Sequence, residues 1–167
     1  LEVVISMIQD SKLNEIIMVD PHSIKIPEMF KIPVHNLSAL SLFAKKIKEI
    51  TRSTPEVKKA PTSGVSTHSD ITIVSPDMGG IRRLKLLDGL LGGVNQVVIN
   101  KDRNYESGEV RAAEYEGKIR GKCFIVDDII STGKTVVQAI DTLDPGGGET
   151  VYVFASHAVF SENASEL

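Results

Sequence analysis

The chain has 167 residues, 41% of them hydrophobic and 25% charged, and its formal net charge at pH 7 is −3. A chain of this length can bury an ordinary hydrophobic core, which favours one domain together with a fragment of a second. The acidic balance argues against a nucleic-acid-binding protein, because such proteins usually carry a basic face, but it leaves small anionic ligands open.

The sequence also bears on the cellular compartment. No apolar run approaches the roughly 18 residues that a membrane-spanning helix needs, so no membrane partner is expected. The single cysteine, Cys123, cannot form an internal disulfide, and no charged-then-apolar signal opens the chain. The expected location is therefore the reducing cytoplasm. The chain begins at Leu1 inside an amphipathic pattern, and we expect it to be a piece of a longer protein.

Short β-branched runs alternate with amphipathic segments along the chain, a pattern typical of a parallel α/β sheet. In chain order, the pattern predicts a strand at 15–20, a helix at 37–50, a strand at 70–77, a helix at 80–91, strands at 96–100 and 123–128, a helix at 135–143 and a strand at 151–157. Residues 51–69 are rich in Ser, Thr, Pro and Lys and predict an exposed loop or insertion. The glycine-rich segment 144–150 predicts a turn.

Most of the predicted strands finish in a polar or charged residue. Ligands of open α/β sheets gather at the carboxyl ends of the strands, so these residues are expected to converge on one rim. The candidates for this rim are Asp20, Asp77, Lys101, Asp127, Asp128 and His157.

The segment 124–135, FIVDDIISTGKT, ends in the three letters that close the phosphate loop of P-loop NTPases. That loop needs a glycine five positions before Gly133, where the backbone wraps around a phosphate. Position 128 is an aspartate, and Asp127 adds a second negative charge that would repel a triphosphate. The spacing therefore excludes a P-loop.

The same residues fit a smaller ligand. The backbone N–H groups and hydroxyls of a helix N-terminus can hold a single phosphate, here at Ser131, Thr132, Gly133, Lys134 and Thr135. The carboxylates of Asp127 and Asp128 can accept hydrogen bonds from vicinal hydroxyls. The pattern predicts a ribose 5-phosphate site, in which Lys134 either faces solvent or adds charge to the phosphate cup.

The segment CFIVDDIISTGKT resembles the phosphoribosyl-pyrophosphate (PRPP) loop of type I phosphoribosyltransferases. Residues 19–47 and VSPDMGGIRR at 74–83, with NKDR and FASHAVFSENA, resemble the ribose-phosphate pyrophosphokinase (PRPP synthetase) family. The resemblance implies an α/β fold with a parallel sheet, like that of type I phosphoribosyltransferases. It also implies transfer of pyrophosphate from ATP to the 1-hydroxyl of ribose 5-phosphate, giving PRPP and AMP in nucleotide biosynthesis.

The resemblance assigns a role to each matching position. His22 and Asp77 match the family's Mg²⁺ positions, and Asp20 is either a further metal carboxylate or a turn residue before Pro21. Lys101 and Arg103 match the cations of the family's catalytic loop, where they stabilise charge on the moving phosphoryl group, and Arg103 also matches a ribose 5-phosphate contact.

Other positions receive weaker assignments. Gly79 and Gly80 are expected to let the backbone approach the pyrophosphate or to open the following helix. The arginines Arg82 and Arg83 are expected to pack against the protein or to form ion pairs, and they are left outside the site.

The family comparison also divides the chain. Residues 1–36 are expected to be the tail of the amino-terminal synthetase domain, and residues 37–167 most of the carboxyl-terminal phosphoribosyltransferase-like domain. A homo-oligomer is implied, because in the family a neighbouring subunit contributes to the ATP site. Two alternatives stay open for the function, namely a phosphoribosyltransferase that uses PRPP and a non-catalytic regulatory homologue of the synthetase. Whether this chain alone is active also stays open.

Overall fold

The computed structural model describes residues 1–52, 70–100, 114–143, 150–161 and 164. The chain divides into two compact units, Leu1–Ala39 and Leu40–Leu167. The predicted loop at 51–69 is wrong at its start, because Thr51 and Arg52 belong to the helix that begins at Leu40, and residues 53–69 lie outside the described residues. Residues 144–149 of the predicted glycine-rich turn at 144–150 also lie outside them. No helix of the described part is long and apolar enough to cross a membrane.

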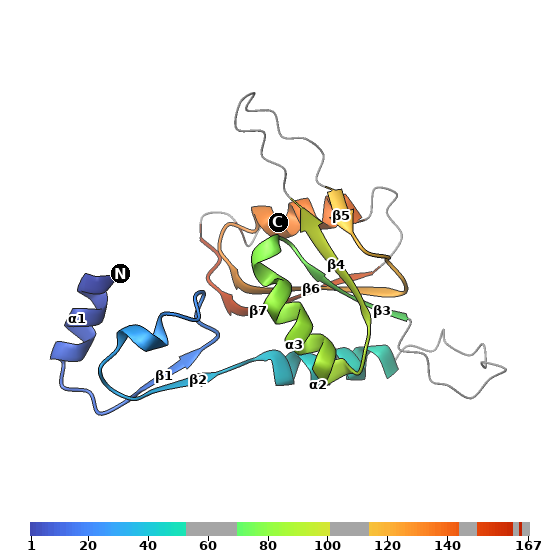
Figure 1. Cartoon of the computed structure of the whole chain (residues 1–167). Coiled ribbons are helices and arrows are strands. Elements are labelled where there is room, and N and C mark those ends of the chain that lie inside the picture. The colour runs from blue at the N-terminus through green and yellow to red at the C-terminus, as the bar shows by residue number, and fades with distance from the viewer. Residues whose placement is uncertain (53–69, 101–113, 144–149, 162–163, 165–167) are drawn as a thin grey trace, which may run out of the picture. The chain divides into compact units, whose positions relative to one another are not determined.

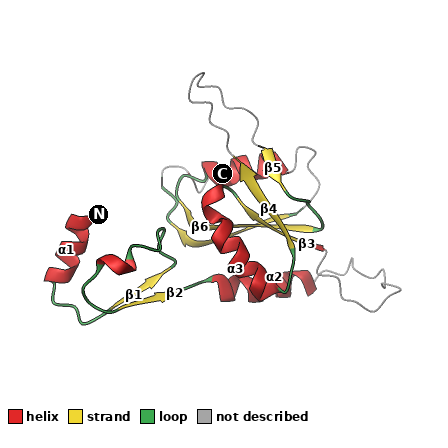
Figure 2. Cartoon of the chain, viewed as in Figure 1, coloured by secondary structure: helices red, strands yellow, loops and turns green. Residues whose placement is uncertain are grey.

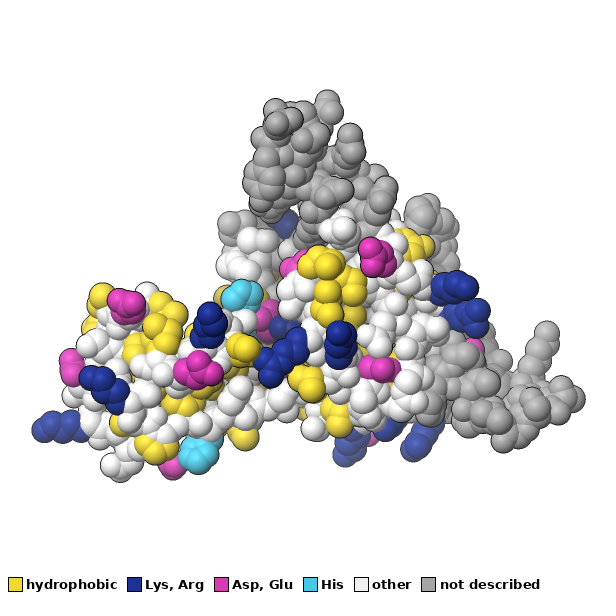
Figure 3. Space-filling view, in the orientation of Figure 1, with side chains coloured by type: hydrophobic (Ala, Val, Ile, Leu, Met, Phe, Trp, Pro, Cys, Tyr) yellow, Lys and Arg dark blue, Asp and Glu magenta, His cyan; other side chains and the backbone are white. Residues whose placement is uncertain are grey.

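The first unit is small and has little core. Its elements are the helix α1 (Glu2–Asp10), the strand β1 (Ile16–Val19), the short 3-10 helix η1 (Pro27–Met29) and the strand β2 (Val34–Leu37). The two strands form a parallel pair in which Ile16 lies opposite Val34 (Figure 1). Ile5 is the buried hydrophobic residue of this unit, and many hydrophobic side chains remain at its surface (Figure 3).

The second unit contains a five-stranded sheet and three α-helices. Its elements are α2 (Leu40–Arg52), β3 (Ile71–Ser75), the 3-10 helix η3 (Met78–Gly80), α3 (Ile81–Leu91), β4 (Asn95–Asn100), β5 (Glu114–Glu116), β6 (Lys122–Ile130), α4 (Lys134–Leu143) and β7 (Val151–Ala158). The strand order is β5-β4-β3-β6-β7. Figure 2 shows the helices in red and the strands in yellow. Among the described strands of this sheet, only the edge strand β5 runs antiparallel to its neighbour. The predicted α/β class with a mostly parallel sheet is confirmed.

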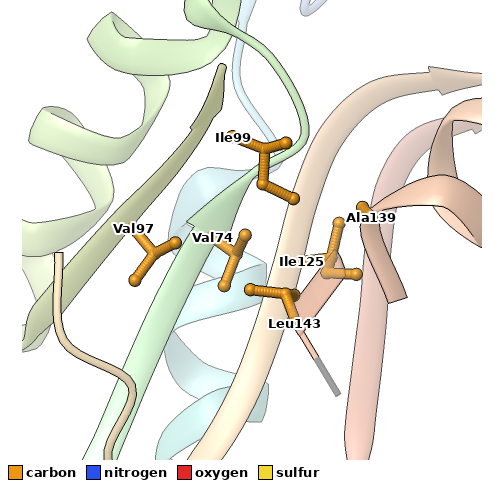
Figure 4. Packing of buried hydrophobic residues seen from close by; sticks show 6 residues of the cluster. All are labelled: Val74, Val97, Ile99, Ile125, Ala139 and Leu143. Carbon is orange, nitrogen blue, oxygen red and sulfur yellow. The ribbon is translucent and has the colours of Figure 1, made fainter. Parts of the chain in front are cut away.

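Helices cover both faces of this sheet. On one face, side chains of β3, β4 and β6 pack against Ala139 and Leu143 of α4, and the six clustered residues are Val74, Val97, Ile99, Ile125, Ala139 and Leu143 (Figure 4). On the other face, the ring of Phe43 in α2 lies 5.3 Å from that of Phe154, which in turn lies 6.0 Å from Phe124. Fully buried strands of this kind read as continuous apolar runs, which is why they were predictable.

The structure differs from the predicted elements at several strand ends. Leu37 belongs to β2 and not to the following helix, which begins at Leu40. The short strands β2 and β5 were not predicted. Strand β6 does not stop at residue 128, because Ile129 and Ile130 pair with His157 and Ala158 of β7. The two aspartates therefore lie within β6, shortly before its end.

Asp20 does not follow a strand of the five-stranded sheet, so the rim that it was predicted to share stays a prediction. This residue follows β1, which belongs to the two-stranded sheet of the first unit and not to the five-stranded sheet. The period-2 pattern that identified β1 carries no information about which sheet a strand joins.

Gly80 and Gly89 form a matched pair for testing the packing of α3. A Cβ atom at Gly80 would overlap the hydroxyl of Ser75 and lie 3.4 Å from Nη1 of Arg83, whereas a Cβ at Gly89 would meet nothing within 4 Å. We expect Gly80→Ala to lower the free energy of unfolding by about 1 to 3 kcal/mol. Gly89→Ala should raise it by up to about 1 kcal/mol. Urea denaturation of both variants tests this, and equal effects would contradict the predicted close packing at Gly80.

Candidate functional site

The candidate site lies where the neighbouring strands β3 and β6 end. These strands are parallel, with Ile71 opposite Lys122 and Val74 opposite Ile125. Their carboxyl ends therefore meet at the same edge of the sheet, where ligands of open α/β sheets bind. The segment after β3 leads through η3 into α3, and the segment after β6 leads through 131–133 into α4.

Asp127, Asp128 and Arg83 form a charged cluster at this edge. Nη1 of Arg83 donates to Oδ1 of Asp127 at 3.3 Å, and Nη2 lies 3.1 Å from Oδ2 of Asp128. The backbone N–H of Asp128 also donates to Oδ1 of Asp127 at 2.8 Å. All three side chains are largely buried, with exposed fractions of 20% for Arg83, 15% for Asp127 and 7% for Asp128. A guanidinium that pairs with two carboxylates leaves one negative charge in excess.

The environment changes the proton affinity of Asp127. Burial raises the pKa of its carboxyl from the ordinary 3.8 to about 6, and the side-chain hydrogen bond and charge of Asp128 act in the same direction. The backbone N–H of Asp128 and the guanidinium of Arg83 act in the opposite direction, because both favour the ionised form. Asp127 is therefore a carboxyl whose charge depends on pH in the slightly acidic range.

The loop from Ser131 to Gly133 turns the chain from β6 into α4. Gly133 has a φ of 76°, a left-handed conformation that favours glycine, and its carbonyl accepts from the N–H of Val137 at 3.0 Å. The side chains of Thr132 and Thr135 are partly buried, and Lys134 is exposed. The predicted phosphate cup thus consists of this loop and the first two residues of the ten-residue helix α4. The backbone N–H groups at the start of a helix have no partner within the helix.

The segment after β7 is bonded to this loop. The hydroxyl oxygens of Ser131 and Ser161 are 2.7 Å apart, and the N–H of Ser161 donates to the carbonyl of Ser131 at 3.0 Å. Val159 and Phe160 also donate to the carbonyl of Ile130. Ser161 therefore fixes the start of the predicted phosphate cup.

Asp77 has a local structural role as well as its predicted metal role. It precedes η3, and its Oδ1 accepts from the N–H of Gly79 at 2.9 Å, while its carbonyl accepts from the hydroxyl of Ser75 at 2.7 Å. The residue is exposed. Within the described part of the chain, no three His, Cys, Asp or Glu side chains gather as a metal site. An Mg²⁺ held by Asp77 would thus need phosphate or water oxygens to complete its shell.

Asp20 and His22, the other predicted metal residues, belong to the first unit. Oδ2 of Asp20 accepts from the N–H of Ala39 at 2.9 Å, and its N–H donates to the carbonyl of Leu37 at 3.0 Å. Asp20 has a φ of 40°, a conformation that aspartate tolerates better than most residues. These contacts favour the turn-residue interpretation of Asp20. His22 is exposed, and joint binding of a metal by His22 and Asp77 stays a prediction.

Sequence reasoning missed two residues of this region, Arg83 and Ser161. Arg83 was left outside the site, although its position one turn into the helix after β3 was a usable signal. Ser161 gave no signal, because its contact with Ser131 depends on the path of the chain after β7. The predicted catalytic residues Lys101 and Arg103 lie outside the described residues.

The chain belongs to the phosphoribosyl transferase domain family, which residues 43–167 match. It is 31% identical over 166 residues to a ribose-phosphate pyrophosphokinase of a Marinomonas species and 27% identical over 166 residues to one of Vibrio cholerae. These alignments cover 99% of this chain and 47% and 48% of the relatives. The crystal structure of phosphoribosylpyrophosphate synthetase from Mycobacterium smegmatis superposes with a TM-score of 0.79 at 26% identity, covering 99% of this chain and 48% of that one.

The chain therefore spans about half the length of the relatives that it matches. The predicted resemblance to the pyrophosphokinase family and the predicted phosphoribosyltransferase-like fold are both confirmed.

Asp127 should make stability depend on pH. Its folded-state pKa of about 6 exceeds the ordinary 3.8, so its favourable contribution is present below 3.8 and is lost as pH rises through 6. Asparagine does not ionise, so we expect this loss to be absent in Asp127→Asn. Between pH 4 and 6.5, the free energy of unfolding of wild type should fall by about 1 to 2 kcal/mol relative to that of the variant. Thermal melts across this range measure the difference. The exposed Asp141→Asn in α4 is the control, and identical pH profiles for wild type and Asp127→Asn would contradict the prediction.

Proposed function

We propose that the whole protein transfers pyrophosphate from ATP to the 1-hydroxyl of ribose 5-phosphate, giving PRPP and AMP. The observation that carries the proposal is the arrangement of β6 and α4. Two neighbouring carboxylates, Asp127 and Asp128, lie a few residues before a helix N-terminus that opens with a hydroxyl-rich turn. The names of the relatives, aligned over 99% of this chain, support the same function.

The two halves of this arrangement suit the two ends of ribose 5-phosphate. The N–H groups at the start of α4 and the hydroxyls of Thr132 and Thr135 hold the 5-phosphate, since a helix N-terminus favours anions. The carboxylates of Asp127 and Asp128 accept hydrogen bonds from the 2- and 3-hydroxyls. A carboxylate oxygen accepts more than one hydrogen bond, so pairing with Arg83 is compatible with this role.

Other residues would bind the metal and stabilise the pyrophosphoryl group that is transferred. Asp77, at the end of the neighbouring strand, would hold Mg²⁺ together with phosphate oxygens, and His22 is a further candidate. Bound there, Mg²⁺ would neutralise charge on the ATP phosphates. Lys101 and Arg103 follow β4, and their cations would stabilise the charge of the moving group. ATP and ribose 5-phosphate are the proposed partners, in a homo-oligomer, as the resemblance implies.

A phosphoribosyltransferase that uses PRPP is the second candidate. The family match at 43–167 favours it, because the family is named for that domain. It differs in what it consumes, since it would need PRPP and a base and would release pyrophosphate. The synthetase instead needs only ATP, ribose 5-phosphate and the metal.

The decisive assay supplies the full-length protein with ATP, Mg²⁺ and ribose 5-phosphate and measures AMP and PRPP. We expect both products in equal amounts without an added base. Lys101→Ala should lower kcat by about a hundredfold or more with a small effect on KM, because its cation acts mainly in the transition state. Full activity of this variant would overturn the catalytic assignment. If wild type forms neither AMP nor PRPP from ATP and ribose 5-phosphate, but releases pyrophosphate when PRPP and a base are supplied instead, the transferase is favoured.

Asp77→Asn tests the metal assignment without removing the local turn. The amide oxygen of asparagine can still accept from the N–H of Gly79, so the variant should fold like wild type. Loss of the negative charge should raise the Mg²⁺ concentration needed for half-maximal activity by about tenfold or more. A titration of activity against Mg²⁺ measures this, and an unchanged Mg²⁺ requirement would show that Asp77 serves only the turn.

A further inference from the structure

We propose that Arg83 is a positioning residue that holds the carboxylates of Asp127 and Asp128 together in the direction of the sugar diol. This inference deepens the proposed function and rests on it. Arg83 would act through the two aspartates and not by touching the substrate.

The geometry of a strand is the first reason. Successive side chains of a strand point to opposite faces of the sheet, so Asp127 starts on the face of Ile125 and Asp128 on the face of Phe124 and Val126. Two vicinal hydroxyls need acceptors on the same side. Arg83 contacts Oδ1 of Asp127 at 3.3 Å and Oδ2 of Asp128 at 3.1 Å with its two terminal nitrogens. Its planar fork therefore joins two side chains that the strand alone would separate.

Repulsion between the carboxylates is the second reason. Both are largely buried, where water screens charge poorly, and two ionised carboxylates on adjacent residues would turn away from each other. The guanidinium offsets this repulsion. It also favours the ionised form of Asp127, which is the form that only accepts hydrogen bonds.

The approach of Arg83 is built into the start of α3. The side chain reaches β6 from a helix whose first turn follows Gly80, a buried residue where a Cβ would lie 3.4 Å from Nη1 of Arg83. The adjacent Arg82 lies on the same helix and is exposed. The two arginines thus differ in position but not in chemistry, which gives the experiment its control.

The surroundings of Asp127 limit which other charges could take this role. Asp128 is its neighbour on β6, and Arg83 approaches from α3. On β7 the residue opposite Asp127 is Ala155, with His157 opposite Ile129, and Asp77 follows β3. Among the described groups that shift the pKa of Asp127, Arg83 is the one that carries a positive charge.

The test compares Arg83→Gln with Arg82→Gln in the full-length protein, using ribose 5-phosphate and 2-deoxyribose 5-phosphate as probes. The deoxy sugar keeps the phosphate and lacks one hydroxyl of the diol. Isothermal titration calorimetry gives the affinity for each sugar. We expect wild type and Arg82→Gln to prefer ribose 5-phosphate, and Arg83→Gln to lose about tenfold or more of that affinity while the affinity for the deoxy sugar changes much less.

Two further measurements sharpen the result. The acidic limb of ribose 5-phosphate binding against pH should move to higher pH in Arg83→Gln, because removing the cation makes Asp127 harder to ionise. Arg83→Lys keeps the charge without the fork and should show an intermediate preference between the two sugars. It also carries the test if Arg83→Gln does not fold, as judged by circular dichroism.

The outcomes separate this inference from the proposed function. Equal losses of affinity for both sugars would mean that Arg83 contacts the phosphate or only supports the fold, and would overturn the positioning role. Unchanged preference in folded Arg83→Gln would overturn it too. If wild type itself binds neither sugar and forms no PRPP, the proposed function fails instead.

Discussion

The pairing of the Arg83 guanidinium with the carboxylates of Asp127 and Asp128 constrains how α3 and β6 are arranged at the carboxyl end of the sheet. Arg83 and Asp127 are 44 residues apart in sequence, and their contact is possible because β3 and β6 are neighbours. Unpaired ions with so little solvent exposure would be costly, so α3 must begin where Arg83, in its first turn, can reach β6. The absence of a side chain at Gly80 follows from the same requirement, since a methyl group there would crowd both Ser75 and Arg83.

The sequence predicted the repeating parts of the fold well. Strands β3, β4, β6 and β7 contain apolar runs with β-branched residues, and α2, α3 and α4 follow the period of an amphipathic helix, so local pattern was sufficient to find them. The short strands β2 and β5 were missed. β5 has three residues and β2 four, too few for a period to appear, and each exists because a neighbouring strand offers its backbone groups.

The candidate site was predictable to a different degree at each residue. Asp127, Asp128 and the turn before α4 form a continuous motif whose chemistry can be recognised from the sequence alone. Arg83 was harder to assign, because it adjoins Arg82: the order of the strands places β6 next to β3, and the rotation of α3 about its axis decides which arginine faces β6. For Asp20, the polar strand end was visible in the sequence but the sheet that its strand joins was not. Long-range pairing, not local propensity, decided both cases.

The charge balance of the cluster bears on whether it is structural or functional. A buried ion pair contributes little net stability even when its charges match, and here two acids face one base. Burial, together with the hydrogen bond and charge of Asp128, raises the pKa of Asp127 to about 6, so at neutral pH the folded protein holds an ionised carboxylate at a cost to its stability. A cluster that served the fold alone would need only one carboxylate to balance the charge of Arg83. Sugar hydroxyls are the class of donor that would complete such a site, because they hydrogen-bond to a carboxylate without requiring a further cation.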